Sequence, residues 1–151
     1  MDLVGAYRLS RCEVRWSNGE VDFPYGPNPE GLLVYTADGY FTGHVMRPDT
    51  PRLSTGARHA PAEETRAAFL GYIGYYGTYG VDREDGTVTH RVLGSWHPNW
   101  VGTDQVRHFR LAGADLVIET PAIASGGRSY RTRLVWKRSG LQEPNESDRI
   151  V

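Results

Sequence analysis

The chain of 151 residues contains a single cysteine, Cys12, so it can form no disulfide within itself. A disulfide framework is therefore excluded, and a reducing compartment is compatible with the composition. The sequence also lacks an apolar run long enough to cross a membrane, and it lacks a basic start followed by an apolar segment. We expect a cytoplasmic protein with no membrane partner.

An excess of charge of either sign is missing as well. The 17 lysine and arginine residues nearly balance the 18 acidic residues, which gives a formal net charge of −1. This balance removes the electrostatic basis for binding nucleic acid. The five histidines lack the spacing of metal ligands, and no phosphate-binding glycine motif occurs. The sequence thus predicts no nucleic-acid partner, no metal and no cofactor.

Short runs of alternating apolar and polar residues, separated by turns rich in glycine, aspartate or asparagine, make up most of the chain. This pattern is typical of antiparallel strands joined by hairpins. In the first hairpin, Gly39 supplies the positive φ that a tight turn needs. We expect about eight strands, over residues 4–16, 31–36, 40–46, 72–81, 87–93, 101–111, 116–120 and 128–138.

One segment favours a helix instead. Pro61 and the acidic pair Glu63 and Glu64 precede good helix formers, which predicts a short helix at about 62–70. Eight sequential antiparallel strands are expected to close, because a barrel removes the exposed edges of an open sheet. We therefore predict an all-β, up-and-down antiparallel β-barrel over residues 1–138. The polar, proline-containing segment 139–151 is expected to be a disordered tail.

The segment from Ser95 to Phe109 gathers two indoles, two imidazoles and a guanidinium around a turn centred on Pro98. Aromatic faces with a few placed polar groups are what a small-molecule site needs, and an eight-stranded barrel is wide enough to hold one small ligand. Trp96 and Trp100 flank the turn. We expect both indoles at the mouth of a ligand cavity.

Four blocks of the chain carry a resemblance to a known family. They are Gly5 to Leu9, Tyr35 to Tyr40, Pro98 to His108, and Leu134 to Arg138. Together they resemble the bacterial and fungal lipocalin-like domain family, with Tyr7 standing where a tryptophan is usual. The resemblance implies a calycin-type barrel that binds a small, mostly apolar molecule, in a family whose members often accompany natural-product biosynthesis.

Alternation along the strands predicts which side chains face inward. Apolar residues such as Leu111 and Leu116 set the phase, which places Gln105, Arg107 and Phe109 inside, with His90 roughly across from Gln105 and Arg107. The same reasoning puts tyrosines of the preceding strand on this wall and a second candidate wall on the strand after the first hairpin. The full set of predicted ligand contacts is Trp96, Trp100, Gln105, Tyr75, Tyr40, His44, Met46 and Phe109.

Two functions are compatible with such a polar interior. In an enzyme promoting cyclisation, isomerisation or dehydration of a polyketide- or terpenoid-like substrate, His90 would be the acid/base, and Arg107 with Tyr79 would polarise a carbonyl or enolate. In a non-catalytic carrier of a hydrophobic or aromatic small molecule, the same residues would only satisfy the oxygens of the ligand. The interior polarity favours the enzyme slightly. The alternatives for single residues are a structural His90, an Arg107 at the rim, and tyrosines that only pack the barrel.

Overall fold

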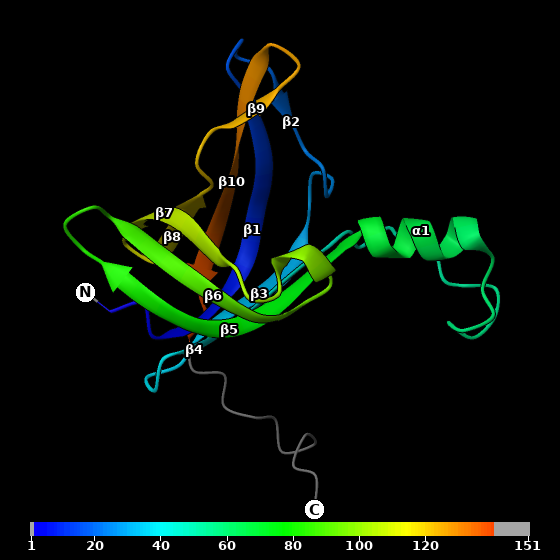
Figure 1. Cartoon of the computed structure of the whole chain (residues 1–151), viewed down its shortest axis with the longest axis horizontal. Coiled ribbons are helices and arrows are strands. Elements are labelled where there is room, and N and C mark those ends of the chain that lie inside the picture. Colours follow the sequence, from blue (N-terminus) through cyan, green and yellow to red (C-terminus); the bar gives the residue numbers. More distant parts are fainter. Residues whose placement is uncertain (1, 141–151) are drawn as a thin grey trace, which may run out of the picture.

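The computed structural model describes residues 2–140, and it is an all-β barrel with one short helix (Figure 1). The long strands are β1 (Gly5–Trp16), β3 (Glu30–Tyr35), β4 (Tyr40–Met46), β5 (Tyr72–Asp82), β6 (Thr87–Ser95), β7 (Asp104–Ala112), β8 (Asp115–Glu119) and β10 (Arg128–Arg138). The chain also contains β2 (Val21–Asp22), β9 (Ile123–Ser125), the helix α1 (Ala62–Leu70) and a 3-10 turn, η1 (Pro98–Trp100).

The sheet closes on itself through its first and last long strands. Neighbours run in the order β2-β1-β3-β4-β5-β6-β7-β8-β10-β9, and β1 also pairs with β10. All pairings are antiparallel, so the eight long strands form the closed up-and-down barrel that the sequence predicts. The short strands β2 and β9, which are absent from the eight strands that the sequence predicts, extend the pairing at one end of β1 and β10.

Most predicted boundaries agree with the structure. The helix occupies Ala62–Leu70 as expected, and it projects away from the barrel with no buried residue (Figure 1). Gly39 has a φ of +93° in the first hairpin, which confirms the turn. The strand expected over 101–111 begins later, at Asp104, because η1 and the following turn take up residues 98–103.

One end of the barrel is closed by packed side chains. Arg138 lies over the ring of Tyr7, 4.8 Å from its centroid, and donates to the Tyr7 hydroxyl at 2.6 Å. The same guanidinium donates to the backbone carbonyls of Val4 and Asp2, while Tyr7 donates to Leu3. These contacts tie the N-terminal segment across the barrel end and join the first strand to the last.

The core lies at this closed end and continues along the inner faces of the strands. Its buried members are Leu3, Tyr7, Leu9, Cys12, Leu33, Tyr35, Phe41, Val45, Val88, Leu116, Ile118 and Trp136. In β1 the inward phase changes from Leu9 to Cys12, because a bulge at Ser10 shifts the register against β10. Cys12 therefore faces the interior.

The remaining features of the fold are its helix content and its C-terminal segment. No helix within residues 2–140 has the length and apolar character needed to cross a membrane. Most of the predicted tail, residues 141–151, lies outside the described residues, while Ser139 donates its backbone N–H to the Ala6 carbonyl at 2.9 Å.

Candidate functional site

The other end of the barrel encloses a cavity of about 770 Å³. Apolar and aromatic side chains line most of it, including Pro121 and Ile123, which are also exposed to solvent. The polar lining groups gather mainly on the wall formed by β5, β6 and β7. A volume of this size is in the ordinary range for small-molecule sites.

The two indoles that the sequence placed at the mouth do border this cavity. Trp96 and Trp100 meet edge to face with centroids 5.1 Å apart, and Trp100 meets the ring of Tyr75 in the same way at 5.3 Å. The rigid turn η1 holds Trp100, because Pro98 fixes the start of the turn and the Thr103 hydroxyl donates to the Trp100 carbonyl at 2.7 Å. His97 lies beside them and also lines the cavity.

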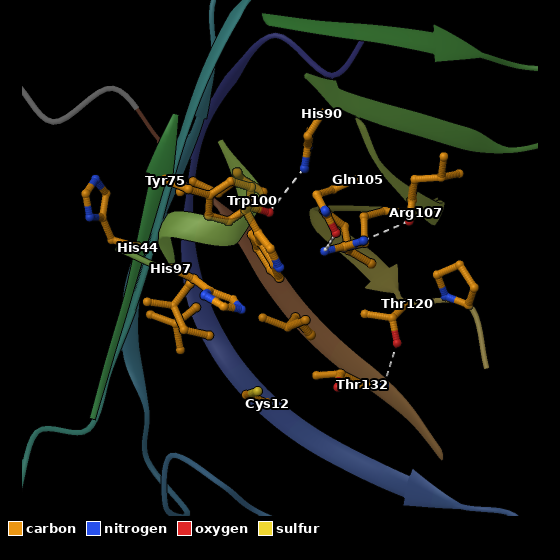
Figure 2. Close-up of a pocket in the computed structure, with 18 of the residues that line it drawn as sticks. Cys12, His44, Tyr75, His90, His97, Trp100, Gln105, Arg107, Thr120 and Thr132 are labelled. Atoms are coloured by element: carbon orange, nitrogen blue, oxygen red, sulfur yellow. Dashed lines mark hydrogen bonds between the residues drawn. The ribbon is translucent and has the colours of Figure 1, made fainter. Parts of the chain in front are cut away.

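The inward phase predicted for β6 and β7 is confirmed. His90 pairs in register with Gln105, and the buried Val88 and Val92 share its face. Arg107 is 9% exposed and points into the cavity, so the rim alternative for Arg107 is wrong. Figure 2 shows Gln105 and Arg107 side by side, with Trp100 and the hydroxyl of Tyr75 close to the Arg107 guanidinium.

His90 is held between two tyrosine hydroxyls. Its Nε2 lies 2.7 Å from the Tyr35 hydroxyl. Its Nδ1 lies 3.1 Å from the Tyr75 hydroxyl (Figure 2). The imidazole also stacks on Phe41, with centroids 4.2 Å apart. Burial, and secondarily the charge of Arg107, lower the pKa of His90 to about 3. The ring is therefore neutral at physiological pH.

The two tyrosines keep their protons for the same physical reason. Burial raises the pKa of Tyr75, although the nearby Arg107 charge opposes the shift, and it raises the pKa of Tyr35 well above its usual value. Cys12, which also lines the cavity, has a pKa raised to about 12, chiefly by burial. Its thiol is neutral and hence a poor nucleophile.

Arg107 reaches the cavity with its orientation set by its own strand. It donates to the Val106 carbonyl at 2.9 Å and to Oε1 of Gln105 at 3.4 Å, while Nε2 of Gln105 donates to the Thr103 hydroxyl. Its guanidinium carbon lies 5.6 Å from the ring centroid of Trp100. The arrangement can hold an oxygen-bearing molecule by donated hydrogen bonds.

Several predicted contacts lie elsewhere. The second candidate wall is wrong: Phe41, Gly43 and Val45 of β4 face inward, so the alternating Tyr40, His44 and Met46 lie on the outer face. Tyr40 is 52% exposed. His44 borders the cavity, but its ring projects away from it (Figure 2), toward the hydroxyls of Tyr72 and Thr42.

Two other predicted residues face inward without lining the cavity. Tyr79 donates its hydroxyl to the Thr36 carbonyl at 2.9 Å and packs on Tyr35, so it is not brought together with Arg107. Phe109 packs against the core cluster. Five residues at or beside the cavity were not predicted from the sequence: Tyr35, Cys12, His97, Thr120 and Thr132. Thr132 donates its backbone N–H to the Thr120 hydroxyl at 2.9 Å.

Sequence comparison agrees with this architecture. The chain belongs to the lipocalin-like domain family, whose model matches residues 4–139. It is similar to the 4'-hydroxy-3'-methoxypropiophenone carrier protein ppsC of Aspergillus oryzae, with 34% identity over 106 residues, 64% of this chain and 95% of that protein. A solved lipocalin-like protein from Bacteroides uniformis superposes with a TM-score of 0.48 and 11% identity, covering 92% of this chain and all of that one.

Proposed function

We propose that this protein binds and carries a small aromatic molecule, such as an aryl ketone or a related phenol, in the barrel cavity. The observation that carries the proposal is the cavity of about 770 Å³, which is mostly apolar and has hydrogen-bond donors on one wall. Such a site buries an aromatic body and satisfies a few oxygens. The similarity to a protein named as a carrier of a hydroxylated, methoxylated propiophenone supports the same ligand class.

The enzymatic alternative receives less support from the geometry. An acid/base catalyst works best when its pKa lies near the operating pH. The pKa of His90 is lowered to about 3, and those of Tyr75 and Tyr35 are raised. The three groups form a fixed chain of hydrogen bonds through His90, and all three are poorly suited to exchange a proton in mid-range pH.

Binding is tested by calorimetric titration with aryl ketones, starting from 4'-hydroxy-3'-methoxypropiophenone. We expect one molecule bound per chain, with quenching of tryptophan fluorescence because Trp96 and Trp100 border the cavity. The ligand should be recovered chemically unchanged after incubation. Turnover of the ligand would instead favour the enzymatic alternative.

A matched pair of variants on β10 locates the bound ligand. Thr132 lines the cavity and Arg131, its neighbour, is exposed on the other face of the strand. Thr132→Trp fills the cavity and is expected to abolish binding, whereas Arg131→Trp should leave binding unchanged. Equal binding by both variants would place the ligand outside the barrel and contradict the proposal.

A further inference from the structure

Arg107 is a buried cation, and no salt bridge to it is found within residues 2–140. Within residues 2–140 the cavity lining includes one carboxylate, Asp104, and its side chain pairs with Arg91 at 3.1 Å and is largely exposed. The acceptors that Arg107 reaches are a backbone carbonyl and an amide oxygen, both neutral. Burying an unpaired charge is costly, and a guanidinium carries more N–H donors than these two bonds use. The remaining donor capacity is directed at whatever fills the cavity.

The hydrogen-bond chain through His90 fixes the direction of a second donor. A neutral imidazole has one N–H and one acceptor nitrogen. Within the described part of the chain, His90 Nε2 is the acceptor found for the proton of the buried Tyr35 hydroxyl. Leaving that proton unbonded in the core would be unfavourable, so Nε2 accepts from Tyr35 and Nδ1 carries the hydrogen.

This tautomer of His90 determines whether the Tyr75 hydroxyl donates or accepts its hydrogen bond with the imidazole. The Nδ1–H of His90 donates to the Tyr75 oxygen, which leaves the O–H of Tyr75 available to a ligand. Because burial raises the pKa of Tyr75, the group remains a donor. Tyr75 and Arg107 thus present donors from neighbouring places on the same wall, beside the face of Trp100 (Figure 2).

We propose that the cavity binds its ligand as an oxygen anion, a phenolate or an enolate, held by the Arg107 guanidinium and the Tyr75 hydroxyl. This inference rests on the proposed function and specifies its ligand class further. On binding, the acidic O–H of the phenol or enol ionises, its proton passes to solvent, and the oxygen keeps the electron pair. His90 and Tyr35 are positioning residues that act through Tyr75, and Gln105 positions Arg107.

The experiment compares two probes of nearly the same shape, 7-hydroxycoumarin and 7-methoxycoumarin. The hydroxyl of the first ionises, and its anion absorbs at longer wavelength than the neutral phenol, whereas the methyl ether cannot ionise. Absorption spectra of the bound hydroxy probe, recorded across pH, give its pKa in the cavity. We expect this pKa to fall by about one unit or more, which corresponds to at least about tenfold preference for the anion.

Variants assign the effect to the two donors. Arg107→Met is expected to abolish the shift and to weaken binding of the anion by about tenfold to a hundredfold, the range for a hydrogen bond to a charged group. Affinity for the methyl ether should change little. Arg110→Met removes an exposed arginine from the outer face of the same strand and serves as the control. Tyr75→Phe, which keeps the ring, should lose part of the shift.

Each outcome decides the question. A wild-type protein that binds both probes but keeps the hydroxy probe neutral overturns the anion proposal and leaves the carrier function standing. A shift that survives in both Arg107→Met and Tyr75→Phe also overturns it. If neither probe binds, the cavity function itself fails, and the anion proposal fails with it.

Discussion

Acidification should destabilise this protein through His90. The imidazole faces Tyr35 from β3, Phe41 from β4, Tyr75 from β5 and Arg107 from β7, and none of these four side chains carries a negative charge. Burial and Arg107 lower the pKa of His90 from 6.5 in the unfolded chain to about 3 in the folded protein. Between these values the unfolded state binds the extra proton, so the free energy of unfolding falls as the pH falls.

The size of this pH effect follows from the difference between the pKa of His90 in the unfolded chain and in the folded protein. The contribution of His90 is fully present above pH 6.5 and decreases below it by at most about 1.4 kcal/mol per pH unit. Lowering the pH from neutrality to 5 therefore decreases the free energy of unfolding of the wild type by about 2 kcal/mol through this group alone. His90→Gln cannot titrate and should lack this component, whatever its own stability at neutral pH.

The assay is urea denaturation of both proteins at several pH values between 7.5 and 5. The comparison of slopes cancels the other titrating groups, which the two proteins share. Tyr75→Phe is the control that keeps His90 and its burial, and it should retain the wild-type slope. Parallel pH dependence in wild type and His90→Gln would refute the account of a buried, neutral imidazole.

Three further predictions concern the barrel itself. Arg138→Met removes the contacts that close the barrel end over Tyr7 and should lower the free energy of unfolding by about 1–3 kcal/mol in urea denaturation; unchanged stability would show that the closure contributes nothing. Gly77→Ala places a Cβ against the Arg91 carbonyl at the bulge between β5 and β6 and should lower the free energy of unfolding by about 1–3 kcal/mol in the same assay; wild-type stability would contradict this close approach of the two strands. Cys12 has a pKa raised to about 12, so its thiol should react with iodoacetamide near pH 8 much more slowly in the native protein than in the urea-unfolded chain, and equal labelling rates would contradict the raised pKa.

The fold was predictable because its signals are local. Each hairpin has its own turn residues, and apolar residues such as Val88 and Val92 repeat at every second position, so β6 and β7 could be placed in phase from the sequence. The same reasoning put His90 roughly across from Gln105 and Arg107. Closure then follows from the number of strands and the instability of free edges.

The candidate site was predictable only in part, because two features are not local. On β4 both faces carry large side chains, and alternation alone cannot choose between the set with Tyr40 and the set with Phe41. The bulge at Ser10 reverses the phase of β1, which hid the inward position of Cys12. Choosing Phe41 for the interior would also have brought in Tyr35, its register partner on β3 and the partner of His90.

The central claim is that the barrel cavity holds an aromatic ligand, and a crystal structure of the protein grown with 7-hydroxycoumarin tests it most directly. We expect the coumarin inside the barrel, beside Trp100, with the oxygen of its 7-hydroxyl group within hydrogen-bond distance of Arg107 and Tyr75. A structure with the coumarin bound only on the outer surface, and the cavity filled by side chains, would contradict it.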